Sequence, residues 1–176
     1  MDVGFGVAGM IRRVGFHAGE SIRIGPTTDA HLYSCGYRVL APGGRYLFNV
    51  WDSHRYNPFG RIAHEVAGSF FPANPPQFYN VPFSYHQIDP IKQSLIDAGF
   101  SDLQIAVVRL EKKIPNVESF ARGLVYGNPL IDQIRERGGV DPDRVVGGIL
   151  EALHREFGAD ARMPLQAIVF SATKPQ

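Results

Sequence analysis

Hydrophobic residues recur at two different spacings along the chain, and these spacings predict alternating helices and strands. The most regular helical spacing follows Asp141, where apolar residues repeat every three or four positions up to Gly158. The same spacing follows Asn57 and continues to Phe70. Runs rich in apolar and β-branched residues predict three strands, over Arg45–Trp51, Leu103–Leu110 and Leu165–Thr173.

Asn-Pro and Asp-Pro pairs predict where helices begin. The polar side chain can cap free N–H groups, and proline fits the first helical position because it has no N–H to leave unpaired. Such a pair can also form a plain turn, but the apolar spacing after each pair favours a helix. The pairs are Asn57-Pro58, Asp89-Pro90, Asn128-Pro129 and Asp141-Pro142. Further helices are predicted over Val117–Tyr126 and Asp29–Leu40, and a long loop over the proline-rich residues 72–87.

The order of these elements predicts an α/β fold. Strand, helices, strand, helices and strand follow one another, which favours a sheet with helices on its faces. The strand Arg45–Trp51 is apolar on both faces, as expected inside a covered parallel sheet.

Composition narrows the possible functions. The 176 residues include 18 Lys and Arg against 17 Asp and Glu, a formal net charge of +1. This balance argues against a nucleic-acid partner, which would require an excess of basic residues. No apolar run is long enough to span a membrane, and the N-terminal residues lack the pattern of a signal peptide, so we expect a cytoplasmic protein. With Cys35 as the single cysteine, neither an internal disulfide nor a zinc site built on paired cysteines is expected, and no metal is predicted.

The segment Tyr37–Phe48 carries the most informative motif. It contains Arg38-Val39-Leu40, then Pro42-Gly43-Gly44 and an apolar strand. This sequence resembles the passage before the fifth strand of class I S-adenosylmethionine (SAM)-dependent methyltransferases, of the small-molecule, type 11-like kind.

The resemblance continues to the C-terminus. Phe48–Asp52 is similar to the end of the fifth strand in these enzymes, and Leu95–Asp102 to the helix and turn before the sixth. Phe120–Gly123 and Gly127–Leu130 resemble a helical insertion between the last two strands, which commonly helps to cover the acceptor substrate. The resemblance therefore implies a Rossmann-like sheet with a helical insertion between its last two strands.

The N-terminal segment matches the family less well. Residues 37–176 form the methyltransferase-like region of a single domain, and residues 1–36 form an atypical, glycine-rich segment. In the family, an acidic-x-Gly-x-Gly turn after the first strand meets the amino-acid part of SAM. Asp2, Gly4 and Gly6 match this turn in their residue types, although only Met1 precedes them; a chance cluster of glycines is the alternative. The stretch before Gly43 is too short for the missing strands, so we expect a sheet that is incomplete on its N-terminal side and a truncated or altered start.

Two functions follow as hypotheses. The resemblance implies methyl transfer from SAM to a small-molecule acceptor, with Trp51, Asp52, Tyr126 and Asn128 as substrate-pocket candidates and no general base that can be named. The alternative is a non-catalytic remnant or interaction domain that forms a homodimer through an exposed sheet edge.

Several other residues have both a functional and a structural interpretation. Trp51–His54 lies at the C-terminal end of a strand, where open α/β sheets bind ligands, but it could also be a loop packed by Trp51. Cys35 is expected to be a core thiol, and His64 and His154 surface or boundary groups. His17 and Glu20 resemble a fragment of a metal site by coincidence, since no partner histidines follow. Aromatic residues of the proline-rich segment could line an acceptor pocket or anchor a loop: Phe70, Phe71, Phe78, Tyr79, Phe83 and Tyr85.

Overall fold

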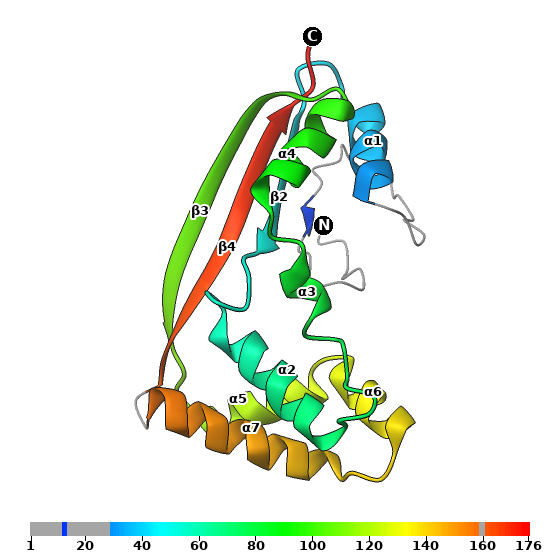
Figure 1. Ribbon diagram of the computed structural model, residues 1–176. Helices are drawn as coiled ribbons and strands as arrows, with labels where there is room; N and C mark the ends of the chain where they lie inside the picture. Colours follow the sequence, from blue (N-terminus) through cyan, green and yellow to red (C-terminus); the bar gives the residue numbers. More distant parts are fainter. Residues whose placement is uncertain (1–11, 14–28, 159–160) are drawn as a thin grey trace. The chain divides into compact units, whose positions relative to one another are not determined.

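The computed structural model describes residues 12–13, 29–158 and 161–176, and Figure 1 shows its ribbon. The strands are β1 (Arg12–Arg13), β2 (Arg45–Trp51), β3 (Ser101–Lys113) and β4 (Arg162–Thr173). The helices are α1 (Asp29–Val39), α2 (Pro58–Phe70), α3 (Val81–Ser84), α4 (Ile88–Asp97), α5 (Val117–Tyr126), α6 (Leu130–Arg137) and α7 (Pro142–Phe157). The three predicted strands are confirmed, two of them longer than predicted, and the fold is a mixed α/β fold.

The described strands form one sheet in the order β1-β2-β4-β3. β1 pairs antiparallel with β2. β4 is also antiparallel to β2, because Lys174 N–H donates to Gly44 O (2.8 Å) near one end, whereas Asp52 N–H donates to Gln166 O (3.1 Å) near the other. The residue numbers therefore rise along β2 as they fall along β4.

β3 also runs antiparallel to β4. Ile114 N–H donates to Ala161 O (2.9 Å), and Ser101 Oγ donates to Thr173 O (3.4 Å). β2 and β3 consequently run in the same direction with β4 between them. The expectation that β2 lies inside a parallel sheet is wrong.

The two faces of β2 differ in exposure. Tyr46, Phe48 and Val50 are buried, whereas Leu47 is 47% exposed. A strand in a pleated sheet points successive side chains to opposite faces, so a run of apolar residues does not by itself show that both faces are covered. The prediction of two covered faces is therefore wrong among the described residues.

The chain divides into two compact units. One contains the described residues up to Val50, with residues 86–108 and 167–176, and the other contains residues 51–85 and 109–166. Residue 36, the boundary expected from the sequence, lies within α1, and most of the preceding segment is outside the described residues. The division at residue 36 stays a prediction.

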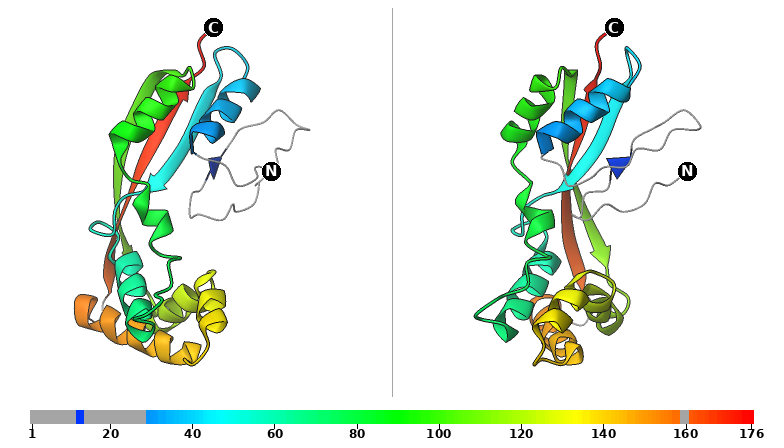
Figure 2. Two further views of the ribbon diagram at one scale, coloured as in Figure 1. Left: turned by 45° about the vertical axis from the view of Figure 1, so that its right-hand side comes forward. Right: turned by 90° about the vertical axis from the view of Figure 1, so that its right-hand side faces the viewer.

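The first unit has an aromatic core between its sheet and helices α1 and α4. The rings of Phe48 and Phe170 stack at 5.0 Å, and Tyr33 of α1 lies 5.4 Å from Phe48. Tyr33 is fully buried, as are Ile91 and Leu95 of α4. Both helices, which run beside the strands of this unit in Figure 2, thus bury apolar side chains on residues of the unit.

The second unit is mostly helical. α7 packs against α2 and α5, and its buried stripe is the one predicted after Asp141. A Cβ at Gly148 would lie 2.9 Å from Val66 Cγ1 and 3.3 Å from Phe70 Cε2, so glycine allows the close approach of α7 to α2. The core of this unit is continuous over α2, α5, α6 and α7.

The predicted helix starts have mixed outcomes. Asp141 caps α7 as predicted, accepting from Asp143 N–H at 3.0 Å. Asn57 stands at the N-cap of α2, but its side chain makes no capping bond. The prediction that Asp89 caps a helix is wrong, because α4 begins at Ile88 and Asp89 lies in its first turn. α6 begins at Leu130, so Asn128 is one residue too early to be its cap.

The proline-rich segment is not wholly a loop. It contains the single-turn helix α3. A helix of four residues is too short to show a hydrophobic period, so the spacing of apolar residues does not indicate it.

Candidate functional site

The candidate site begins where β2 ends and contains an asparagine that joins two distant segments. Asn57 is fully buried. Its Nδ2 donates to Asp52 O (2.9 Å), Gln166 O (3.0 Å) and Ser53 O (3.3 Å), and its Oδ1 accepts from Gln166 N–H (3.0 Å). One side chain therefore satisfies backbone groups of the β2–α2 loop and of β4. This is why its amide is not free to cap α2.

A second set of polar bonds adjoins Asn57. Gln166 Nε2 donates to Asp52 Oδ2 (2.6 Å), and Ser53 N–H donates to Asp52 Oδ1 (2.6 Å). Arg109 Nε donates to Gln166 Oε1 (2.9 Å). Asp52 and Gln166 are both buried. We call Asp52, Asn57, Arg109 and Gln166 the polar clamp.

A histidine follows the polar clamp within the same loop. His54 Nε2 lies 2.8 Å from Tyr79 O, and because a carbonyl oxygen only accepts, Nε2 carries the hydrogen. The ring lies 4.8 Å from Phe83 and 5.7 Å from His64. Burial lowers the pKa of His54, an effect that the bond to Tyr79 partly offsets. Burial thus favours the neutral form of the His54 imidazole.

His64, which was expected at the surface or a boundary, has one buried nitrogen. Among the described residues, its Nδ1 is buried without a hydrogen-bond partner. The side chain is otherwise half-buried on α2, so the boundary position is confirmed, whereas His154 on α7 is exposed. Buried polar atoms without a hydrogen bond are uncommon in proteins. His64 Nδ1, in the ring beside His54, is such an atom, so packing alone does not explain this position.

Tyr79 connects His54 to helix α5. Its hydroxyl donates to Leu124 O (2.8 Å) and accepts from Asn128 Nδ2 (3.0 Å). The ring is buried, and desolvation raises the pKa of the hydroxyl well above its usual value. The carbonyl that fixes His54 therefore belongs to a residue whose own side chain is anchored.

Removing the hydroxyl tests this anchor. Tyr79→Phe is expected to lower the free energy of unfolding by about 1–2 kcal/mol, because Leu124 O loses its donor and Asn128 loses an acceptor. Urea unfolding followed by the fluorescence of Trp51 measures it. Tyr56→Phe is the matched control, since Tyr56 is 38% exposed. Equal unfolding midpoints for the two variants would show that Tyr79 is not an anchor.

Three of the predicted pocket residues lie around this arrangement. The Trp51 ring is 5.8 Å from Phe59 and 6.0 Å from Phe83. Asp52 belongs to the polar clamp, and Asn128 binds Tyr79. The structure thus connects them through Phe83, His54 and Tyr79. Phe83 and Tyr79 are both buried in the core beside the site, a position that fits the lining of a pocket and the anchoring of a loop equally well.

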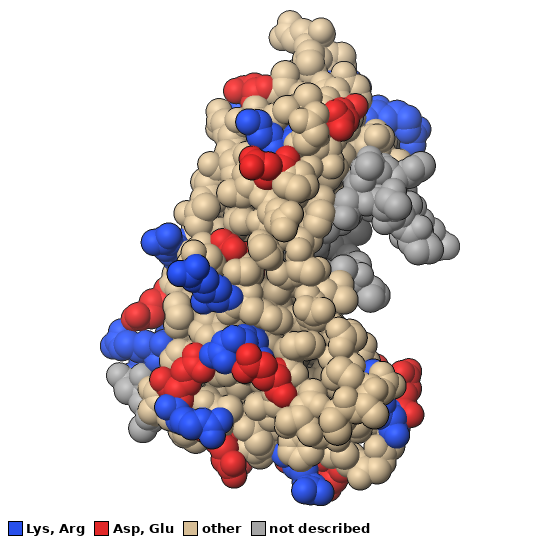
Figure 3. Space-filling model, in the orientation of Figure 1, with Lys and Arg blue, Asp and Glu red and all other residues tan. Residues whose placement is uncertain are grey.

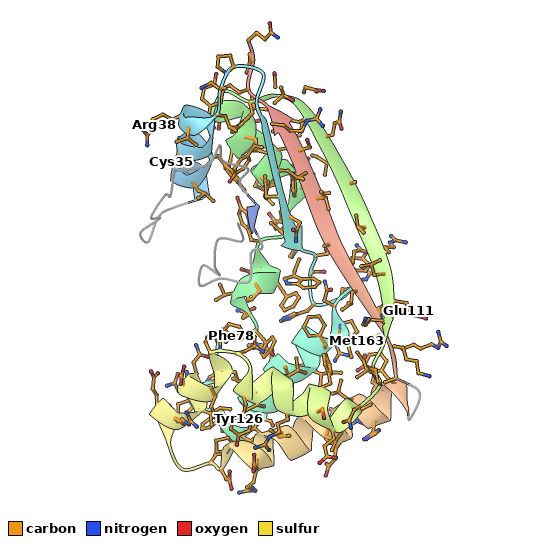
Figure 4. The ribbon with its side chains drawn as sticks, turned by 180° about the vertical axis from the view of Figure 1, so that it is seen from behind. Cys35, Arg38, Phe78, Glu111, Tyr126 and Met163 are labelled. Carbon is orange, nitrogen blue, oxygen red and sulfur yellow. The ribbon has the colours of Figure 1, made fainter. Side chains whose placement is uncertain are left out.

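The fourth predicted residue, Tyr126, belongs to a different group. Its hydroxyl donates to Asp143 Oδ1 (2.6 Å), and Arg122 lies over its ring at 4.5 Å. This contact lies between α5 and α7 (Figure 4), and neither Asp143 nor Arg122 is among the residues that bind His54 or form the polar clamp. The bond raises the pKa of Tyr126 and lowers that of Asp143.

The remaining predicted residues are placed as follows. Asp2, Gly4 and Gly6, and likewise His17 and Glu20, lie outside the described residues. Cys35, labelled in Figure 4, is half-buried on α1 rather than fully in the core. No group of three metal-ligating side chains occurs within the described ranges. In the same ranges, no helix is both long and apolar enough to cross a membrane.

Sequence reasoning missed Asn57 and Gln166 as site residues, and it left Tyr79 with two interpretations, as part of a pocket wall or as a loop anchor. The pair Asn57-Pro58 drew attention to Asn57, but it indicated a helix cap. Gln166 is 109 positions from Asn57 and meets it only through the pairing of β2 with β4. Tyr79 appeared only as one aromatic residue among many in the proline-rich segment.

On the face of the molecule that Figure 3 shows, charged side chains give no second candidate site. In Figure 3, basic and acidic groups alternate over the second unit. Several are paired: Arg61 with Glu65 and Glu156, and Arg162 with Glu111 at 3.3 Å. A mixed surface of this kind does not favour a highly charged ligand.

Asp52 can be compared with one cofactor residue of the class I methyltransferases that the sequence resembles, in which an acidic residue at a strand end binds the ribose hydroxyls of SAM. Asp52 stands at such an end, but each of its oxygens already accepts a hydrogen bond. The residues expected to meet the cofactor, Asp2, Gly4 and Gly6, are outside the described ranges.

Comparison with known proteins gives a limited result. Neither a protein-family model nor a curated protein matches the chain. Among solved structures, it is similar to phosphoethanolamine N-methyltransferase 2 of Haemonchus contortus in complex with phosphomonomethylethanolamine and S-adenosylhomocysteine. The identity is 18% and the TM-score 0.37, over 84% of this chain and 30% of that chain. A structure of the same enzyme in complex with SAM is 19% identical, with a TM-score of 0.39. The match covers 86% of this chain and 31% of that chain.

A third similar structure is a proposed methyltransferase from Bacillus halodurans C-125. Its identity is 18% and its TM-score 0.45, over 84% of this chain and 63% of that chain. All three structures are thus of proteins described as methyltransferases, and this chain spans less than two thirds of each. Similarity at these values carries no argument about function.

Proposed function

We propose that the chain takes part in methyl transfer from SAM to a small-molecule acceptor, and that residues 51–85 and 109–166 supply the acceptor side. The observation that carries the proposal is the arrangement at the end of β2, where the polar clamp adjoins the neutral imidazole of His54. Open α/β sheets bind ligands at the carboxyl ends of their strands, and Asp52 and His54 follow the carboxyl end of β2.

Two further features support this proposal. The sequence from Tyr37 onwards resembles the class I methyltransferases through several motifs in the same order. Helices α5, α6 and α7 lie between β3 and β4 in the chain, where the resemblance expects a helical insertion over the acceptor. Asn128 links this insertion to Tyr79, whereas Tyr126 is a weaker candidate because it faces Asp143.

Ligand-induced stabilisation tests the proposal. A ligand at 100 times its Kd stabilises the folded state by about 2.7 kcal/mol. In a chain of this length that corresponds to a rise in Tm of roughly 5–10 °C. We expect this rise with SAM and with S-adenosylhomocysteine, followed by Trp51 fluorescence. ATP, which has the adenosine but no methionine part, is the control, and an unchanged Tm with all three ligands would contradict the proposal.

A second candidate function is a non-catalytic domain that associates with a copy of itself. β3 lies at one edge of the described sheet, and Val107 and Leu110 on it are 47% and 63% exposed. Exposed edge strands offer unpaired backbone groups to another chain. Sedimentation velocity separates the two candidates: a dimer that does not bind SAM favours this one, and a monomer that binds SAM favours the first.

A further inference from the structure

The imidazole of His54 has one nitrogen in use and one free. Nε2–H donates to Tyr79 O at 2.8 Å, which fixes the tautomer. Nδ1 then carries the lone pair. Among the described residues, it has no hydrogen-bond partner and is not buried, in contrast to Nδ1 of His64.

Several groups hold the ring in this orientation. Tyr79 is anchored through its hydroxyl to Leu124 O, so the carbonyl that accepts from Nε2 has a defined position. Phe83 lies 4.8 Å from the imidazole, and His64 5.7 Å from it at an interplanar angle of 34°. The free nitrogen is therefore directed by packing as well as by its hydrogen bond.

Burial favours the neutral form of the ring. Desolvation is the largest effect on the pKa of His54 and lowers it. His64 and Arg61 lower it further, while the bond to Tyr79 and the carboxylate of Glu65 raise it. A neutral imidazole is the form that can accept a proton.

We propose that His54 is the proton acceptor of the acceptor site, taking the proton of a hydroxyl-bearing small molecule on Nδ1. This inference rests on the proposed function. In the step, the O–H bond of the acceptor breaks, its oxygen keeps the electron pair, and a new N–H bond forms at Nδ1. The imidazolium later returns the proton to water. Tyr79 acts as a positioning residue, since it holds Nε2–H and leaves Nδ1 free.

The first experiment measures the ring itself. Long-range ¹H–¹⁵N NMR of the full chain is expected to show the hydrogen of His54 on Nε2, with a pKa below the usual value of about 6.5. A hydrogen on Nδ1, or a ring that is already protonated at pH 7, would overturn the proposal. Neither readout requires SAM, so a failure here is distinct from a failure to bind SAM.

The second experiment uses diethyl pyrocarbonate, which reacts with the free lone pair of a neutral imidazole. Peptide mass spectrometry is expected to find His54 modified at pH 7. His154, exposed on α7, controls for the activity of the reagent. Unmodified His54 beside modified His154 would also overturn the proposal.

The variant His54→Gln gives the functional readout. Its amide can still donate to Tyr79 O, but it has no basic nitrogen. In a methyl-transfer assay that the wild type supports, we expect kcat to fall about 100-fold or more, and the acid limb of its pH profile to disappear. The KM for SAM is expected to stay unchanged. An unchanged kcat would contradict the role, and the two measurements on the wild type remain decisive if the variant does not fold.

Discussion

Replacing Asn57 by alanine is expected to lower the free energy of unfolding by about 3 kcal/mol or more, because several buried backbone groups lose their partner at once. Gln166 N–H loses its acceptor, and Asp52 O and Ser53 O lose a donor. Each unsatisfied buried group costs about 1–3 kcal/mol. Urea unfolding followed by the fluorescence of Trp51, the single tryptophan, measures the loss.

Two further variants complete this test. Asn57→Asp keeps an acceptor for Gln166 N–H but has no donor, so its carboxylate would face carbonyl oxygens and the loss should be at least as large. Asn80→Ala is the control, because the Asn80 side chain is exposed and its amide donates to Gln77 Oε1 at 3.3 Å, and the expected change is within about 0.5 kcal/mol. A loss for Asn57→Ala no larger than that of Asn80→Ala would refute the polar clamp.

Replacing Gly60 by alanine should also destabilise the chain, although alanine is the better helix former. A Cβ at this position of α2 would lie 2.6 Å from Phe83 Cζ and closer still to Cε2. The Phe83 ring cannot easily move, because Phe59 lies 5.6 Å from it and His54 4.8 Å. The overpacking should outweigh a helix-propensity gain of about 1 kcal/mol and leave a net loss of about 2 kcal/mol.

A control lies in the same helix. At Gly68 the nearest atom to a new Cβ is Pro75 Cβ at 3.6 Å, an ordinary contact. Gly68→Ala should therefore stabilise by up to about 1 kcal/mol. Adding Phe83→Leu to Gly60→Ala should recover part of the loss by making room for the methyl group. If Gly60→Ala were as stable as Gly68→Ala, the packing of α2 against Phe83 would be wrong.

Much of the secondary structure could be predicted from the sequence, because it depends on local spacing. The apolar period after Asp141 gives α7, and three apolar runs give β2, β3 and β4. The direction of β4 could not be predicted in this way, since an apolar run does not indicate whether its neighbours are parallel. Nor could the exposure of Leu47, because it depends on which atoms cover that face of β2.

The candidate site was predictable only where its residues adjoin a strand end. Trp51 ends β2, Asp52 and His54 follow it, and the rule for ligand binding in open sheets indicated them. The partners of these residues are remote in sequence: Gln166 binds Asp52, and Tyr79 binds His54. Both bonds arise from tertiary packing, which no local motif records.

Calorimetric titration of SAM into the full chain is the most direct test of the proposed methyl transfer. We expect saturable heat from one site with a Kd in the micromolar range, equivalent to about −8 kcal/mol at 1 μM. Asp2→Ala should weaken this binding if the N-terminal glycine turn meets the cofactor, and unchanged binding would remove that turn from the site. Measurable heat is expected for the wild type, and an absence of heat at millimolar SAM would contradict the proposed methyl transfer.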